Sequence, residues 1–189
     1  MSALKNPGWA LTGLCLLMLA TRFNHFGSVA TLPDASLAVF FFGGIYLRKI
    51  KWFVILLLEA ALIDFIAIEY AGVSSYCISP AYVFLIPTYG VMWASGFFCT
   101  HLNLLSTRGF VQSTGLLITA TTIAFLISNI SFYLFSGRFS DLVLTDYFTR
   151  VAPYYSPYLL STLVYSSLIV MIHFGLRSFA APIQHSNHS

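Results

Sequence analysis

Six apolar stretches dominate the sequence, and they restrict the chain to the folds that a lipid bilayer permits. Hydrophobic residues make up 58% of the 189 residues and charged residues only 8%, whereas about 25% of an ordinary soluble domain is charged. A segment that crosses a bilayer must satisfy its backbone hydrogen bonds internally, which favours helices of about 20 apolar residues. The composition therefore predicts an integral membrane protein of the all-α class.

The apolar stretches predict six membrane-spanning helices in one domain that covers residues 1–189. The expected spans are 8–22, 34–47, 51–70, 80–101, 112–135 and 155–177. Pro33-Asp34 is a helix start signal before the second span. The first stretch continues to Ala20 with no small-residue cleavage signature, so we expect a first span rather than a signal peptide.

The distribution of Lys and Arg predicts the orientation of this bundle. With the N-terminus inside, the inner segments carry six of the nine basic residues: Lys5, Arg48, Lys49, Lys51, Arg108 and Arg177. This excess favours cytoplasmic termini, and it explains the net charge of +3 better than a nucleic-acid partner does. The expected outer loops are 23–32, 71–79 and 136–153, and residues 141–148 could form a short amphipathic helix over the bundle. Because long loops on one face usually carry function, we expect the ligand site at the outer face.

Cys77 is the cysteine best placed for chemistry. It lies in a polar, turn-forming loop with Gly72 and Pro80, whereas Cys15 and Cys99 lie inside apolar spans and are expected to be small buried hydrophobes. Three cysteines without a CxxC motif argue against a disulfide framework or a structural zinc site. Cys77 is either an inert thiol or a thiolate ligand of a metal. A single thiolate suits a metal that arrives already chelated by a corrin or a porphyrin.

Asp64 is the second candidate, because an ionisable residue inside a membrane helix is a functional hypothesis by default. It lies roughly 20 Å along the helix from Lys51. Small residues share its predicted face and should turn it into the bundle: Ala60, Ala61, Ala67 and Ala71. Its alternative role is that of a structural carboxylate. His25, at the start of the first outer loop, is either polar surface or part of the same site.

Aromatic residues gather in sequence around Cys77. They are Tyr70, Tyr76, Tyr82, Phe84, Tyr89 and Trp93. Aromatic faces with polar tips suit a flat macrocycle rimmed with amides, although an aromatic belt at the membrane interface explains part of the pattern. The chain lacks the nucleophile-elbow, zinc-protease, P-loop and dinucleotide-binding motifs, and Gly43-Gly44 is expected to be a packing feature.

Six short spans in about 190 residues, with functional loops on the outer face, resemble the substrate-binding S-components of energy-coupling-factor (ECF) vitamin transporters. More closely, His25, Asp64, Cys77 and Tyr82, in this order and spacing, resemble the BtuM family of bacterial cobalamin transporters. The similarity is clearest from Thr21 to Gly96.

This resemblance implies an S-component-like bundle in the bacterial inner membrane that binds vitamin B12 from the outer side. Cys77 would ligate the cobalt of cobalamin through its thiolate and hold the vitamin base-off. His25, Asp64 and Tyr82 would complete the binding site. A thiolate opposite cyanide on cobalt would also favour loss of cyanide, so Cys77 would take a catalytic part in decyanation of cyanocobalamin.

The first span departs from many S-components in the small-residue motif that docks the energy-coupling module. Ala10 is followed by Leu14, with Gly13 and Ala20 out of register, so the docking motif is weak and a transporter that works alone is expected. Two alternatives remain open at this point. One is an S-component for another vitamin, such as thiamin or riboflavin, and the other is a membrane enzyme or haem-binding protein that uses the Cys77 thiolate.

Overall fold

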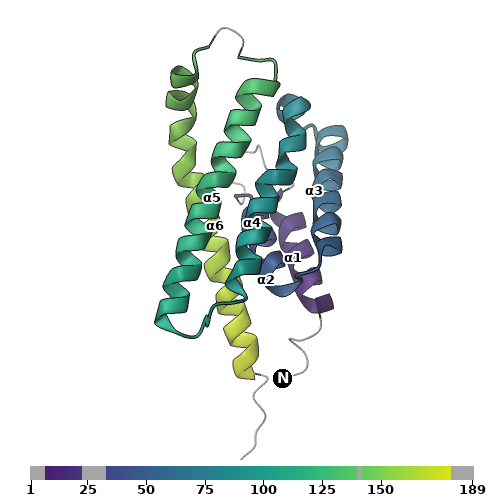
Figure 1. The fold of residues 1–189 in the computed structure, drawn as a ribbon. Coiled ribbons are helices and arrows are strands. Elements are labelled where there is room, and N and C mark those ends of the chain that lie inside the picture. The colour runs from purple at the N-terminus through teal and green to yellow at the C-terminus, as the bar shows by residue number, and fades with distance from the viewer. Residues whose placement is uncertain (1–6, 23–32, 140–141, 180–189) are drawn as a thin grey trace, which may run out of the picture.

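The computed structural model describes residues 7–22, 33–139 and 142–179. These residues form six α-helices and no sheet (Figure 1). The helices are α1 (Pro7–Arg22), α2 (Ser36–Tyr46), α3 (Ile50–Ala71), α4 (Leu85–Cys99), α5 (Thr107–Phe135) and α6 (Leu144–Phe179). Two short 3₁₀ helices, η2 (Ser75–Cys77) and η3 (Pro80–Phe84), join α3 to α4. The predicted all-α class and the six helices are thus confirmed.

Three of the helical segments are long and apolar enough to cross a membrane. They are Pro80–Cys99, Thr107–Phe135 and Leu144–Leu176, and they indicate a membrane protein. α1 and α2 are shorter, with 16 and 11 residues. α3 has 22 residues, but every 18-residue window of it holds Glu59, Asp64 and a third charged residue, either Lys51 or Glu69. Its length is therefore that of a span, and its charge is higher than that of an ordinary one.

The long helices run up and down the same axis (Figure 1). The start of α1 and the end of α6 lie at one end of the bundle, which also holds the α2–α3 and α4–α5 connections. The 3₁₀ helices and the end of α5 lie at the opposite end. The two ends of the bundle thus correspond to the two groups of connections that the sequence separates by charge.

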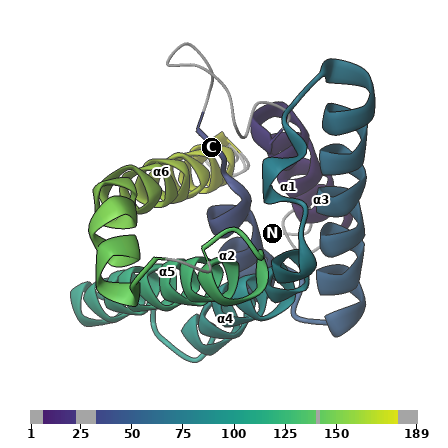
Figure 2. The same cartoon turned by 90° about the horizontal axis from the view of Figure 1, so that it is seen from above.

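α2 lies in the middle of the bundle, as the view along the axis shows (Figure 2). It packs against α1, α3, α4 and α6, and every residue from Ser36 to Gly44 is buried. A helix that is apolar on all sides is stable only when it is surrounded. The continuous apolar sequence of α2 therefore explains its central position.

Glycines bring α2 and α4 into close contact. A Cβ atom on Gly44 would overlap the carbonyl oxygen of Trp93, and one on Gly96 would overlap the carbonyl oxygen of Phe41. Backbones approach this closely only where side chains are absent. The expectation that Gly43-Gly44 is a packing feature is confirmed.

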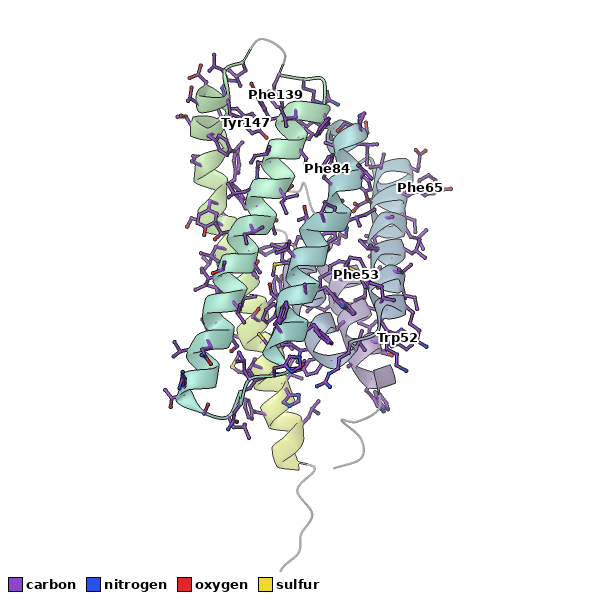
Figure 3. The ribbon with its side chains drawn as sticks, viewed as in Figure 1. Trp52, Phe53, Phe65, Phe84, Phe139 and Tyr147 are labelled. Carbon is purple, nitrogen blue, oxygen red and sulfur yellow. The ribbon has the colours of Figure 1, made fainter. Side chains whose placement is uncertain are left out.

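The start of α6 differs from the sequence prediction. α6 is one continuous helix from Leu144, so the separate amphipathic helix expected near residues 141–148 is wrong, and Pro153 and Pro157 lie inside the helix. Membrane helices tolerate proline where neighbouring groups satisfy the freed carbonyls. Aromatic packing supports this first part of α6, since Tyr147 contacts Phe139 with ring centroids 4.8 Å apart (Figure 3).

Candidate functional site

An ion pair between Arg22 and Asp64 lies at the centre of the candidate site. Arg22 is the last residue of α1, and its side chain is only 1% exposed. Its Nε donates to Asp64 Oδ1 at 2.7 Å, and its Nη2 donates to Asp64 Oδ2 at 2.6 Å. This two-bonded geometry is the strongest arrangement available to arginine and a carboxylate. The pair therefore joins the end of α1 to the middle of α3.

The remaining nitrogen of Arg22 is used by α2 and α4. Nη1 donates to Ser36 Oγ at 2.8 Å and to Tyr89 Oη at 2.6 Å, and it lies 3.6 Å from Asp34 Oδ2. A buried charge is tolerated when it is paired and its donors are occupied. Arg22 meets both conditions. Because its partners belong to three other helices, it connects α1 to α2, α3 and α4 at one point.

Tyr82 completes the set of groups around Asp64. Its hydroxyl donates to Asp64 Oδ2 at 2.7 Å, so the carboxylate accepts three charge-assisted hydrogen bonds. η3 positions Tyr82 for this contact, because Ser79 caps the turn by accepting from the Ala81 N–H at 3.3 Å. The structure thus brings together Asp64 and Tyr82, two residues singled out from the sequence.

The face of α3 that enters the bundle differs in part from the predicted one. Asp64 points inward, with its side chain 11% exposed, and Ala60 and Ala67 are buried. Ala61 and Ala71, which were expected on the same face, are exposed. The buried face instead includes Leu56 and Ile63, because a period of 3.6 residues places these positions beside Ala60 and Ala67.

A pocket of about 210 Å³ opens beside the ion pair. Arg22, Asp64 and Tyr82 form one wall, and α5 supplies a second wall with three polar side chains, Ser128, Asn129 and Ser131. Apolar residues complete the lining: Ala81, Phe84, Leu85 and Phe132. Apolar walls with a few convergent polar groups are typical of small-molecule sites.

Two of the four predicted site residues have no described side chain. His25, with the rest of the predicted loop 23–32, lies outside the described residues, as do His185 and His188 of the tail. For Cys77 the backbone is described and ends η2, five residues before Tyr82 in the chain. Within the described part of the chain, no group of three or more His, Cys, Asp or Glu side chains could hold a metal ion.

Arg22, the last residue of the first expected span, is the site residue that the sequence prediction missed. A signal for it was present in Asp64, since a carboxylate inside a membrane helix requires a cationic or hydrogen-bonding partner. Periodicity cannot choose that partner among nine basic residues. The α5 wall was missed for a similar reason, because Ser128, Asn129 and Ser131 lie within an otherwise apolar span.

Searches for related proteins add no assignment to these observations. No protein-family model matches the chain, and no curated protein matches it.

Proposed function

We propose that this protein binds cobalamin and carries it across the bacterial inner membrane. The observation that carries the proposal is the hydrogen bond between Tyr82 and Asp64 in the wall of a pocket. Both residues belong to the sequence pattern that resembles cobalamin transporters of the BtuM family. Cys77, the third member, lies in the chain between them, on the turn that leads directly into η3.

Under this proposal the Cys77 thiolate is the axial ligand of cobalt. A corrin ring supplies four in-plane nitrogens, so a single protein thiolate is sufficient, and no protein cluster of metal ligands is required. The thiolate displaces the nucleotide base and holds the vitamin base-off. His25, Asp64 and Tyr82 contact the rest of the ligand or position the groups that do.

The same ligation gives Cys77 a catalytic part in decyanation of cyanocobalamin. A thiolate donates electron density to Co(III) and weakens the cobalt–carbon bond on the opposite side. Cyanide then leaves with the electron pair of that bond, and cobalt remains Co(III) with sulfur as its ligand. The step needs no reductant.

The size of the pocket limits how cobalamin enters. A volume of about 210 Å³ is below the roughly 300–1,000 Å³ of sites for drug-sized ligands, and cobalamin is larger than those. In the present conformation the pocket accepts only an edge of the ligand. Binding and transport therefore require the elements around Arg22 and Asp64 to move apart.

Under this proposal the chain crosses the lipid bilayer six times, and both termini lie in the cytoplasm. The weak docking motif around Ala10 and Leu14 favours a transporter that works without an ECF energy-coupling module. Both residues lie on α1, where Leu14 is buried against the core and Ala10 is partly buried. They are thus occupied by contacts within the chain.

The experiment is a visible spectrum of the purified protein after incubation with cyanocobalamin. We expect the wild type to retain the corrinoid with a shifted spectrum that has lost the cyanide-bound form. The Cys77→Ala variant should show neither the shift nor tight retention. Cys99→Ala is the matched control, because Cys99 is buried near the opposite end of α4.

Each alternative predicts a different result. If wild type and Cys77→Ala both retain the vitamin with the spectrum of the free ligand, thiolate ligation and decyanation are refuted. If neither binds it, the cobalamin assignment fails, and thiamin and riboflavin are tested next. A haem-type spectrum without added cobalamin would instead favour a membrane enzyme or haem-binding protein.

A further inference from the structure

The inner face of α6 carries a row of polar side chains. Its members share one side of the helix: Tyr155, Tyr158, Thr162, Tyr165 and Ser166 follow one another at spacings of one to four residues, and His173 comes about two turns after Ser166. From the first to the last, the row covers roughly 27 Å at 1.5 Å per residue, close to the ~30 Å hydrocarbon thickness of a bilayer. It lies within the segment Leu144–Leu176 that can span a membrane.

The row faces the interior of the bundle. Near its start, the Tyr155 hydroxyl lies 2.7 Å from Thr122 Oγ1 of α5. At its other end, His173 Nδ1 lies 3.3 Å from the hydroxyl of Tyr46 on α2, and the two rings are stacked. The opposite face of α6 carries exposed apolar side chains instead: Leu160, Val164, Leu168, Met171 and Ile172. The inner side of α6 therefore combines this polar row with Leu163, Ile169 and Val170, which pack against the core.

Two hydroxyl groups in the middle of this row have no hydrogen-bond partner among the described residues. They belong to Tyr165 and Ser166, which are 7% and 6% exposed. Neighbouring hydroxyls differ, since Thr162 donates to the Tyr158 carbonyl and Ser167, on the outer face, donates to the Leu163 carbonyl. Leaving a buried hydroxyl without a partner destabilises a protein, and buried water commonly satisfies such groups.

The row also connects to the candidate site. Tyr155 and Tyr158 pack edge-on against Phe125 of α5, with ring centroids 5.2 and 5.3 Å apart. Phe125 lies one turn before Asn129 of the pocket wall, and its carbonyl accepts from Asn129 Nδ2 at 2.9 Å. The start of the row therefore lies next to the pocket wall that α5 forms. The other end lies at His173, toward the end of the bundle where α6 finishes (Figure 1).

We propose that this inner face of α6 is the wall of a hydrated route by which the ligand passes from the pocket to the opposite end of the bundle. The inference rests on the proposed transport function and specifies its path. Thr162, Tyr165 and Ser166 are buried in this structure, so the route is closed at that level. Polar side chains inside membrane segments mark substrate and ion pathways, and hydroxyl groups suit a ligand rimmed with amides.

Thiol labelling tests whether this face meets water. Ser166→Cys and Ser167→Cys differ by one position, and the second thiol faces outward. A charged methanethiosulfonate reagent attacks thiolates, which form in water and not in lipid, so Ser166→Cys should react about tenfold faster or more. Site-resolved mass spectrometry on membrane vesicles separates these thiols from the native cysteines. Thr162→Cys is a second probe in case Ser166→Cys does not fold.

Equal labelling at positions 166 and 167, with Thr162→Cys as slow as the native Cys99, would overturn the hydrated route. This experiment needs no cobalamin, so it remains decisive if the proposed function fails. A uniformly dry interior would instead support movement of the whole bundle in the membrane.

Uptake measurements test whether the ligand uses the route. Ser166→Ala removes the hydroxyl with little change in volume, and Ser167→Ala is its control. We expect cobalamin uptake into proteoliposomes to fall roughly five- to tenfold for Ser166→Ala, with cobalamin retention by the purified variant unchanged. Unchanged uptake would overturn the route while leaving the cobalamin assignment intact. If the wild type does not bind cobalamin, the proposed function is refuted, but the inference that water reaches the inner face of α6 is not.

Discussion

At the scale of single residues, the site depends on one buried arginine. Arg22 donates hydrogen bonds to Asp64, Ser36 and Tyr89 and lies beside Asp34. Removing one member of such a pair leaves an uncompensated charge in a region of low dielectric, whereas removing both does not. A buried ion pair is therefore recognised by its mutational pattern, in which a single substitution lowers the free energy of unfolding more than the double substitution does.

We expect Arg22→Gln and Asp64→Asn each to lower the free energy of unfolding by about 3–5 kcal/mol. Thermal unfolding of the detergent-solubilised protein measures the loss. The double variant Arg22→Met with Asp64→Leu should lose less than either single change, because no unpaired charge remains. Glu69→Gln, at an exposed position on the same helix, is the control. Equal effects of Asp64→Asn and Glu69→Gln would contradict a buried ion pair.

Tyr82→Phe tests the third hydrogen bond to Asp64. Because the acceptor is charged, loss of the hydroxyl should destabilise the protein by about 1.5–3 kcal/mol. Tyr70→Phe is the matched control, since Tyr70 is exposed at the end of α3, and it should leave the melting temperature unchanged. If the two variants have the same melting temperature, the Tyr82 hydroxyl contributes nothing to the stability of the fold.

At the scale of elements, the contact between α2 and α4 determines how closely the central helix is enclosed. Gly44 and Gly96 permit this contact because each faces the backbone of the other helix. Phe40 of α2 also stacks on Tyr89 of α4, with ring centroids 4.2 Å apart. Tyr89 in turn accepts from Arg22, so the position of α4 affects the site directly.

Gly96→Ala should separate α2 from α4 and destabilise the protein by about 1–3 kcal/mol, the usual range for overpacking. Gly90→Ala is the control on the same helix, because nothing lies within 4 Å of a Cβ atom there. That change should instead stabilise α4 by roughly 0.5–1 kcal/mol, since alanine loses less entropy in a helix than glycine does. Melting curves of both variants distinguish the two effects, and a shift in the same direction would refute the close contact.

At the scale of the whole molecule, the two ends of the bundle differ in charge. The connections beside the start of α1 and the end of α6 carry Arg48, Lys49 and Lys51 before the core of α3, and Arg108 at the start of α5. The opposite end carries Arg138 and, in the first two turns of α6, Asp146 and Arg150. An excess of Lys and Arg in short connections favours the cytoplasmic side.

Reporter fusions test this orientation. Alkaline phosphatase fused after Leu105, in the α4–α5 connection, should be inactive, because that connection is expected to lie in the cytoplasm. The same reporter fused after Gly137, between α5 and α6, should be active. A fluorescent protein fused at the two sites should show the reverse pattern. If the two alkaline phosphatase fusions were both active or both inactive, the result would contradict a membrane crossing by α5.

The sequence by itself determined the helical class, the number of helices and the inward direction of Asp64. Each follows from a local requirement, because a long apolar run must close its own hydrogen bonds and a carboxylate within it must leave the lipid. The region of Tyr82 was predictable for a similar reason, since Pro80 and Ser79 mark the start of a turn next to an aromatic cluster.

Only the tertiary structure decided which residues meet. The partner of Asp64 is Arg22, 42 positions away, and the choice depends on where the end of α1 lies against α3. The wall from α5 and the inner face of α6 likewise depend on which side of each helix faces the bundle. α6 continues through Pro153 because packing supports a helix that local propensity would end. Local chemistry requires a partner for each buried polar group, and the packing of the helices determines which partner it finds.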